Sequence, residues 1–213
     1  MFSGLIREIG KIASLRGNRL SVLCEYEPRI GDSIAVNGVC LTAIESSKKG
    51  FVAELSETTK SLIALENFSP NAPVHIEPAL RADSRLDGHI VQGHIDGIGV
   101  IEAITHHAAQ SDFFLSTAPQ TLKAILPKGS ISVDGVSLTI VDVAPSGFWL
   151  TIIPHTLHNT LFKTYKLSQR VNLETDMFVR NTLAILQNLQ AHNQIPTRSP
   201  KSWASIDSIQ LAF

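Results

Sequence analysis

The sequence SIAVNGVCLT (residues 33–42) recurs as SISVDGVSLT (residues 130–139), 97 positions further along the chain. Seven of the ten positions are identical, and an eighth pairs Asn37 with Asp134. In both copies, polar and apolar residues alternate up to an Asn-Gly or Asp-Gly dipeptide, and an apolar run follows. Such alternation is typical of a half-buried strand, and these dipeptides accept the positive φ angles of a tight turn. Each copy therefore predicts a β-hairpin.

Other segments repeat in the same order. VHIE (residues 74–77) matches VNLE (171–174) at the same spacing of 97, whereas GLI (4–6) matches GHI (93–95) at a spacing of 89. A weaker match pairs Ser56-Glu57-Thr58 with Pro154-His155-Thr156. Because several separated segments keep their order, we interpret the chain as a duplication. The change of spacing predicts about eight extra residues in the second copy, which we place around residues 106–111.

Short strands separated by turns characterise each copy. Further strands are predicted at residues 51–55, 148–153 and 171–173, where β-prone apolar residues are concentrated. Strand-like segments also contain glycines, which predict bulges or a close approach of two backbones: Gly4, Gly10, Gly93 and Gly99. A unit of this size with such strands favours a small closed barrel, since closure removes the unpaired edges.

The end of the chain has no counterpart in the first copy. Asp176 is a candidate helix cap, and the residues after it place apolar side chains at helical spacing, at Phe178, Val179, Leu183, Leu186 and Leu189. The apolar stripe could pack on its own barrel or on another copy of the chain, and the pattern leaves both open. We assign no structure or role to residues 193–213.

The composition limits the function classes. Of the 213 residues, 44% are hydrophobic and 17% are charged, which supports buried cores, and the formal net charge is −1. That charge gives no strong attraction to nucleic acid or to an anionic membrane. Two cysteines are too few for a disulfide framework, and no secretory signal or long apolar span is recognisable. We therefore expect a cytoplasmic protein with no nucleic-acid or membrane partner.

Six separated sequence blocks carry a resemblance to a known family. They are MFSGLI (1–6), NGVCLT (37–42), GHIVQGHIDG (88–97), KG (128–129), DGVSLT (134–139) and IPHTL (153–157). Together they resemble riboflavin synthase, an enzyme built from two lumazine-binding repeats. The resemblance covers roughly residues 1–190. It weakens at residues 58–63, which lack the family's usual Thr-Leu-Arg continuation, and at Asp87, where a glycine is common.

The resemblance implies an all-β fold, with two tandem six-stranded Greek-key barrels and a C-terminal α-helix. The expected domains are an N-terminal lumazine-binding barrel (1–89), a C-terminal one (90–175), an oligomerisation helix (176–192) that assembles a homotrimer, and a tail (193–213). The implied reaction is a dismutation of two molecules of 6,7-dimethyl-8-ribityllumazine. One molecule transfers a four-carbon unit to the other, which gives riboflavin and 5-amino-6-ribitylamino-uracil.

The reaction joins two copies of one molecule, so it needs two similar pockets, and a duplicated domain supplies them. It requires positioning and proton transfer, and we expect no cofactor or metal. Together, the resemblance and the repeat imply a substrate site formed by Gly4, Leu5, Ile6, Cys40, Leu41, Thr42, Ala53, Glu54, Leu55, Ser56, Glu57, Thr58, Gly93, His94, Ile95, Lys128, Ser137, Leu138, Thr139, Ile153, Pro154, His155, Thr156, Leu157 and His158.

Four of these residues are candidates for catalysis: His94, Cys40, Ser137 and Thr139. His94 occupies the position of Leu5 in the first copy, and such asymmetry is expected where one site donates and the other accepts. A histidine bonded to backbone is the alternative. Cys40 and Ser137 are equivalent positions, and an inert buried thiol is the alternative for Cys40. We expect His89 to be structural, and Asp176 to reach a neighbour's site or only to cap the helix.

Two other functions remain open. The chain could be a non-catalytic lumazine- or flavin-binding protein of the antenna type, which shares the duplicated fold. It could also be a tandem-barrel interaction module. Both copies keep the hairpin and the polar residues that follow it, which favours the enzyme.

Overall fold

The structure is a computed structural model, and it describes residues 1–191. The first barrel is closed by β1–β6 in the order β1-β2-β5-β4-β3-β6. Its strands are β1 (Glu8–Arg16), β2 (Arg19–Leu23), β3 (Ser33–Val36), β4 (Val39–Ser47), β5 (Gly50–Glu54) and β6 (Pro73–Pro78). Two short helices, α1 (Glu57–Leu62) and η1 (Leu65–Phe68), connect β5 to β6. All strand pairs are antiparallel.

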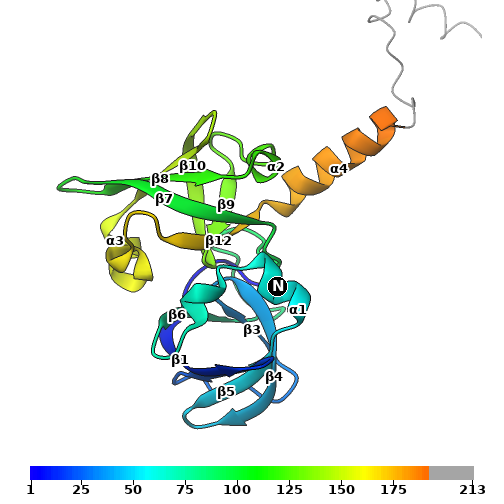
Figure 1. Ribbon diagram of the computed structural model, residues 1–213, viewed down its shortest axis with the longest axis vertical. Helices are drawn as coiled ribbons and strands as arrows, with labels where there is room; N and C mark the ends of the chain where they lie inside the picture. Colours follow the sequence, from blue (N-terminus) through cyan, green and yellow to red (C-terminus); the bar gives the residue numbers. More distant parts are fainter. Residues whose placement is uncertain (192–213) are drawn as a thin grey trace, which may run out of the picture. The chain divides into compact units, whose positions relative to one another are not determined.

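The second barrel repeats this order with β7-β8-β11-β10-β9-β12 (Figure 1). Its strands are β7 (Gly97–His106), β8 (Ser111–Thr117), β9 (Ser130–Val133), β10 (Val136–Ala144), β11 (Gly147–Ile152) and β12 (Arg170–Thr175). The helices are α2 (Pro119–Leu122), α3 (Pro154–Asn159), η2 (Leu161–Thr164) and, after the barrel, α4 (Met177–Ala191). In each barrel three hairpin-connected strands are followed by one that returns beside the first of them, which is a Greek key. The expected fold class is confirmed.

The repeated hairpins have the expected turns. Asn37 and Gly38 have φ angles of 44° and 78°, and Asp134 and Gly135 have 45° and 86°. Both turns therefore need two residues that tolerate positive φ, which explains the dipeptides. The strands on either side bury apolar side chains in the two barrel interiors, around Phe51 and Ile76 in the first and Phe113 and Phe148 in the second.

Two details of the sequence interpretation were wrong. The eight extra residues do not lie in one loop: Arg19 and Asp112 occupy equivalent places in the strand pairing, 93 residues apart. Four extra residues thus lengthen the β7–β8 hairpin, and four more fall between β8 and β9, the connection that contains α2. Gly4 and Gly93 precede strands rather than lie within them.

The expected helix is present as α4, and the expected tail, residues 193–213, lies outside the described residues. Among those residues no helix is long and apolar enough to cross a lipid bilayer.

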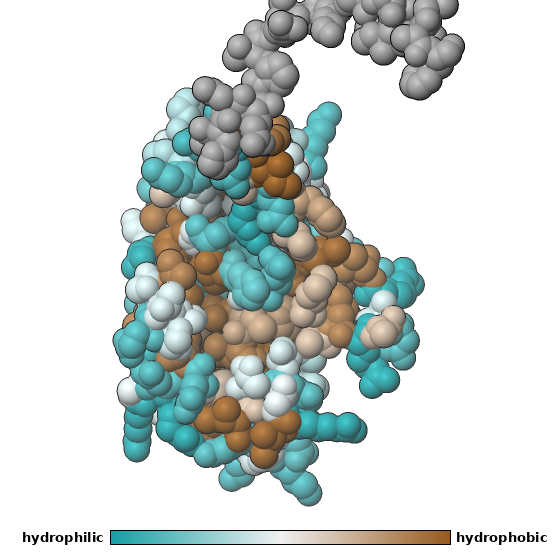
Figure 2. All heavy atoms as spheres, turned by 90° about the vertical axis from the view of Figure 1, so that its right-hand side faces the viewer, coloured by the Kyte–Doolittle hydropathy of each residue, from teal (hydrophilic) through white to brown (hydrophobic). Residues whose placement is uncertain are grey.

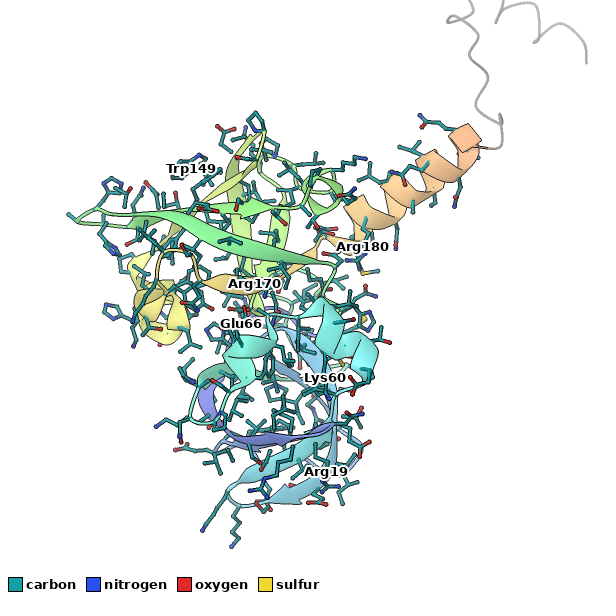
Figure 3. The ribbon with its side chains drawn as sticks, in the orientation of Figure 1. Arg19, Lys60, Glu66, Trp149, Arg170 and Arg180 are labelled. Carbon is teal, nitrogen blue, oxygen red and sulfur yellow. The ribbon has the colours of Figure 1, made fainter. Side chains whose placement is uncertain are left out.

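Polar contacts join the two barrels, and the side chains that make them occupy equivalent positions in the two copies. His75 Nδ1 lies 2.8 Å from the carbonyl oxygen of Asp134, and its Nε2 accepts the amide N–H of Leu161 at 2.8 Å. Asn172 is the equivalent residue: its Nδ2 donates to the Asn37 carbonyl, and its Oδ1 accepts an amide N–H of the first copy. His75 therefore behaves as a neutral donor–acceptor side chain with the proton on Nδ1. An ion pair between Arg170 and Glu66, at 3.1 Å, also joins the copies (Figure 3).

This role of His75 predicts a pH dependence of stability. Burial lowers the pKa of His75 to about 4, from its ordinary value of 6.5. Between these values the unfolded chain binds the proton more tightly, so the contribution of His75 is fully present above pH 6.5 and is lost as the pH falls towards 4. Relative to His75→Asn, the wild-type free energy of unfolding should drop by about 3 kcal/mol from pH 6.5 to 4. Denaturant titrations at several pH values measure the difference.

The comparison with a variant is needed because of Asp134. Burial raises the pKa of Asp134 to about 7, so its contribution to the free energy of unfolding changes with pH in the opposite direction. Both proteins retain Asp134, so its contribution cancels in the difference. The substitution His106→Asn, at an exposed position, serves as the control and should leave the wild-type slope unchanged. A pH-independent difference between wild type and His75→Asn would contradict the assignment.

Candidate functional site

Two hollows of similar size lie at equivalent places in the two copies. The N-pocket, of about 190 Å³, is lined by Val39, Cys40, Thr59, Leu62, Ile63, Gly93, His94 and Ile95. The C-pocket, of about 180 Å³, is lined by Gly4, Leu5, Ile6, Arg7, Val136, Ser137, His155, Thr156, Asn159 and Thr160. Every residue of the N-pocket has its repeat counterpart in the C-pocket, at a spacing of 97 for barrel residues and 89 for the glycine segment. The duplication thus extends to the lining of two pockets.

Each pocket is built by one barrel and a segment that belongs to the other copy. Residues 93–95 directly precede the second barrel, yet they line the N-pocket, where the Cys40 amide N–H donates to the Gly93 carbonyl at 2.9 Å. Residues 4–7 precede the first barrel, yet they line the C-pocket, where the Ser137 N–H donates to the Gly4 carbonyl at 2.8 Å. Phe2 and Val91 pair with each other between these segments. Neither copy alone would form its pocket.

The crossing segments require glycine. Gly93 has a φ angle of +83°, and a Cβ atom there would lie 2.5 Å from the Cys40 Cβ. Gly4 has a φ angle of +76°, and a Cβ atom there would lie 2.5 Å from the Ser137 Cβ. Both the backbone conformation and the space therefore exclude a side chain. The expected close approach at these glycines is confirmed.

Two buried carboxylates hold the crossing segments. Glu174, at the end of β12, accepts the amide N–H groups of Gln92, Gly93 and His94 at 2.7, 2.7 and 3.0 Å. Glu77 in β6 accepts those of Ser3 and Gly4 at 2.8 and 3.0 Å. Burial raises the pKa of both carboxyl groups, and the hydrogen bonds counteract that shift. Both glutamates stand in the repeated VHIE and VNLE segments, so the repeat marked them, although we assigned them no role.

Arg180 gives the N-pocket segment a second support. It lies in the first turn of α4 and donates to the Gln92 side chain at 2.7 Å (Figure 3). It also forms an ion pair with Asp96, whose carboxylate accepts the Thr175 amide N–H at 3.1 Å. The segment that carries His94 is therefore held at both ends. Asp83 and Arg7 occupy the equivalent positions of Arg180 and Asp96 in the first copy, so this support is not duplicated.

His89 contacts a residue of the C-pocket lining. Its Nδ1 lies 2.7 Å from the Ser137 hydroxyl, and its Nε2 is buried without a hydrogen-bond partner among the described residues. Burial lowers the pKa of His89, against the opposing effect of the nearby Asp176 carboxylate. A neutral imidazole bonded to a pocket hydroxyl can accept a proton. The sequence interpretation of His89 as merely structural missed this contact, which connects residues 48 positions apart.

The structure brings ten of the expected site residues into the pockets: Gly4, Leu5, Ile6, Cys40, Gly93, His94, Ile95, Ser137, His155 and Thr156. Others lie elsewhere. Leu41, Ala53, Leu55 and Leu138 are buried in the barrels, and Thr42 and Thr139 are exposed. Ser56 caps α1, and Lys128 is exposed with a φ angle of +65° and donates its amide N–H to Ile140.

The remaining expected residues lie in α1 and α3 or shortly before them, and they line neither pocket. They are Glu54, Glu57, Thr58, Ile153, Pro154, Leu157 and His158. Sequence reasoning missed eight lining residues: Thr59, Leu62, Ile63, Asn159 and Thr160, which lie in or directly after α1 and α3, and Arg7, Val39 and Val136. The weak match of Thr58 with Thr156 was one residue out of register, because the pocket counterpart of Thr156 is Thr59. With the spacing of 97 applied to this segment, the register would have been found.

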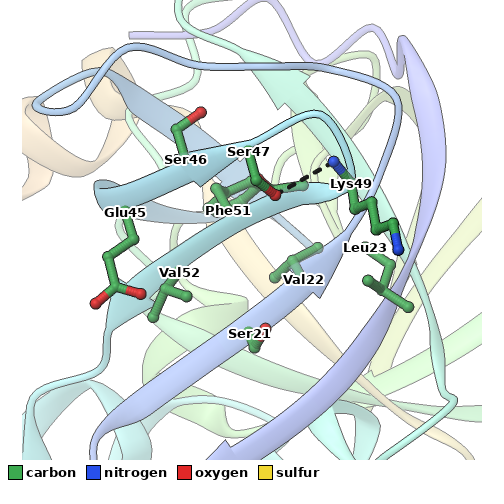
Figure 4. Close-up of a pocket in the computed structure, with 10 residues that line it drawn as sticks. Ser21, Val22, Leu23, Glu45, Ser46, Ser47, Lys49, Phe51 and Val52 are labelled. Atoms are coloured by element: carbon green, nitrogen blue, oxygen red, sulfur yellow. Dashed lines mark hydrogen bonds between the residues drawn. The ribbon is translucent and has the colours of Figure 1, made fainter.

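A third hollow is not duplicated. It lies on β2, β4 and β5 of the first barrel, with Ser21 and Val52 in its lining (Figure 4). The second barrel has Phe114 and Trp149 at these two places, and their rings are 5.0 Å apart. Large aromatic side chains thus cover the equivalent surface in the second copy. Because aromatic side chains occupy the equivalent places in the second barrel, this hollow does not fit a function that the duplication preserves.

Removing a crossing glycine should disrupt one pocket. Gly93→Ala adds a methyl group against Cys40 and forces alanine to a positive φ. We expect it to destabilise the protein by about 3 kcal/mol or more, since a backbone penalty and a steric clash add. Gly17→Ala is the matched control, because Gly17 has a φ angle of +57° but no atom lies within 4 Å of the place that an alanine Cβ would take. It should cost only about 1 kcal/mol. Chemical denaturation measures the free energy of unfolding of both variants. Equal losses of stability would show that the close approach of Gly93 to Cys40 imposes no constraint.

The chain matches known proteins over most of its length. A family described as lumazine binding domain matches residues 3–79 and again 92–176. A riboflavin synthase from Actinobacillus pleuropneumoniae is 38% identical and covers 100% of this chain and 99% of its own length. A riboflavin synthase from Bacillus subtilis is 35% identical over 83% of this chain and 86% of its own length. The fold is similar to LumP complexed with 6,7-dimethyl-8-(1'-D-ribityl) lumazine, with a TM-score of 0.72, 19% identity, and coverage of 82% of this chain and 99% of that one.

Proposed function

We propose, from the premise that this chain belongs to the riboflavin synthase family, that it converts two molecules of 6,7-dimethyl-8-ribityllumazine to riboflavin and 5-amino-6-ribitylamino-uracil. The observation that carries the proposal is the pair of pockets whose linings correspond residue by residue. Two identical reactants need two similar binding sites, and holding both in place replaces a bimolecular encounter by a positioned one.

The reaction needs proton transfer on one molecule and attack on the other. The methyl group on carbon 7 of one lumazine loses a proton, and carbon 7 of the other accepts a nucleophile. We assign proton handling to His94 in the N-pocket and to the His89–Ser137 pair in the C-pocket. The Ser137 hydroxyl faces the pocket and can relay a proton to the neutral His89 imidazole.

The productive pair of pockets is formed between subunits of a homotrimer that α4 assembles. This helix exposes apolar side chains, and Phe178, Ile185 and Leu186 are 61%, 59% and 44% exposed. Apolar side chains also gather over the middle of the molecular face that Figure 2 shows. Such side chains favour contact with another copy of the chain.

We also place the protein in the cytoplasm, where its free thiols Cys24 and Cys40 would stay reduced.

A second candidate function is lumazine or flavin binding without turnover. The similarity of the fold to LumP favours it, although at 19% identity that similarity concerns the fold alone. Incubation of the full chain with the lumazine as the only substrate separates the two candidates. The enzyme should form half a mole of riboflavin per mole of lumazine consumed, as detected by absorbance. Tight binding without product would contradict the enzyme, and no binding of lumazine or flavin would favour an interaction module.

Replacement of His94 should affect turnover more than binding. Because His94 is assigned to proton transfer, His94→Gln should lower kcat by about a hundredfold or more while the dissociation constant for the lumazine changes little. The control His106→Gln alters an exposed histidine of the β7–β8 hairpin and should keep both values. Steady-state kinetics and equilibrium dialysis measure the two quantities. A His94→Gln variant with normal kcat would remove His94 from the mechanism.

Charges on the exposed face of α4 should separate assembly from ligand binding. Ile185→Asp with Leu186→Asp should give monomers in sedimentation experiments, since carboxylates oppose burial of that face. The substitutions leave Arg180 and its support of the N-pocket intact. We expect turnover to fall at least tenfold while lumazine still binds. Gln187→Asp, at an exposed polar position of the same helix, is the control. A double variant that is monomeric and fully active would rule out a site between subunits.

A further inference from the structure

The His94 ring is positioned in the N-pocket through its backbone. The side chain is exposed and lines the pocket, and it forms no hydrogen bond with residues 1–191, the part of the chain that the structure describes. Its place therefore depends on the segment that carries it, residues 92–96. A ring that transfers a proton must be held closely, since a displacement of about 1 Å can slow a reaction about a hundredfold.

Arg180 binds this segment on both sides of His94. Its Nη2 donates to the Gln92 side-chain oxygen at 2.7 Å, and its Nη1 forms an ion pair with Asp96. Nη1 also donates to the Thr175 carbonyl at 3.1 Å, which anchors the guanidinium. The two side chains of the ion pair are 28% and 24% exposed, so water screens them less than it screens an ordinary surface pair. One guanidinium thus holds the residues two positions before and two positions after His94.

The first copy holds its crossing segment in a different way. Ser3 is the counterpart of Gln92, and its amide N–H and its hydroxyl both donate to Glu77 at 2.8 Å. A carboxylate, Asp83, stands at the position of Arg180. The arginine support therefore accompanies the crossing segment that carries a histidine.

Arg180 also acts on the charge of Glu174, the other anchor of the segment. The Glu174 oxygens accept the amide N–H groups of residues 92–94, and an ionised carboxylate accepts them most strongly. Burial raises the pKa of Glu174, whereas these hydrogen bonds and the guanidinium lower it. The other side chains to consider are Asp176 two residues later, Asp96 on the same guanidinium, His94 in the segment, and the uncharged Ser132, its partner on β9. Arg180 is the permanent cation among them and favours the ionised form.

We propose that Arg180 is a positioning residue for His94 and so affects the rate of proton transfer in the N-pocket. It lines neither pocket and acts through Gln92, Asp96 and Glu174. The inference rests on the proposed function, because it takes His94 to transfer a proton in the lumazine reaction. It adds a residue from the first turn of α4 to those on which the N-pocket depends.

Substitution of Arg180 in the full chain tests this. Arg180→Gln removes the charge, and it should lower kcat on the order of tenfold because the segment around His94 is held less closely. The dissociation constant of the lumazine should rise less than about threefold, since Glu174 still binds the backbone of the segment. Steady-state kinetics and equilibrium dialysis measure the two quantities.

The pH profile separates positioning from general destabilisation. Without the guanidinium the pKa of Glu174 rises further, so Glu174 binds a proton at a higher pH. The acid limb of the kcat profile should therefore move to higher pH by about half a unit or more. Arg180→Lys keeps the charge, so it should keep the wild-type acid limb and recover part of kcat. Gln92→Ala removes one contact but no charge, so it should lower kcat without moving the limb.

Arg19→Gln is the matched control. Arg19 forms an ion pair with Glu45, and neither residue lines the N-pocket or the C-pocket. This variant should keep the wild-type kcat and acid limb. Hydrogen exchange gives a measurement that needs no turnover: the amide hydrogens of residues 92–94 should exchange about tenfold faster in Arg180→Gln than in wild type.

Wild-type values of kcat, acid limb and exchange in Arg180→Gln would overturn the inference, and so would an equal loss of kcat in Arg19→Gln. Should Arg180→Gln not fold, Arg180→Lys and Gln92→Ala give the same test, and an unchanged kcat in both would refute the role. A wild type without turnover of the lumazine would instead refute the proposed enzyme. Exchange at residues 92–94 would then decide whether Arg180 positions the segment.

Discussion

Both pockets depend on a backbone crossing between the two repeats. The segment that leads into each barrel passes against the hairpin of the other barrel, so closely that only glycine fits at Gly4 and Gly93. A buried carboxylate then fixes each segment by its amide groups, Glu77 in one copy and Glu174 in the other. Since residues 93–95 carry His94 into the N-pocket, the crossing also decides which pocket receives this histidine. Each copy therefore needs the other to complete its pocket.

The fold could be predicted from the sequence because its signals are local. The Asn-Gly and Asp-Gly turns, the alternation before them and the repeat itself each involve neighbouring residues or simple spacing. The pockets were predicted in part for the same reason, through Cys40, Ser137 and the glycine segments. What the sequence did not reveal depends on contacts between distant residues. Examples are the hydrogen bond from His89 to Ser137 and the support of Gln92 by Arg180.

The short helices α1 and α3 explain the other omissions. Sequence reasoning placed the site residues of these segments at 53–58 and 153–158, whereas the lining residues that it missed there lie further along the chain, at Thr59, Leu62, Ile63, Asn159 and Thr160. Ser56 illustrates the physical reason: its hydroxyl accepts the Thr59 amide N–H at 3.0 Å, so it caps α1. One turn of helix then moves the pocket residues three to four positions along the chain. Lys128 likewise owes its place to a backbone turn, shared with Gly31, and it lines neither pocket.

Mixed assemblies of two inactive variants test the central claim that one N-pocket and one C-pocket of different subunits act together. Chains with His94→Gln retain an unaltered C-pocket, and chains with Ser137→Ala retain an unaltered N-pocket. When the two are unfolded together and refolded in equal amounts, activity should return to about a quarter of the wild-type value, the chance that random assembly of a cyclic trimer places the two intact pockets at one site. A mixture that is no more active than the separate variants would contradict the account.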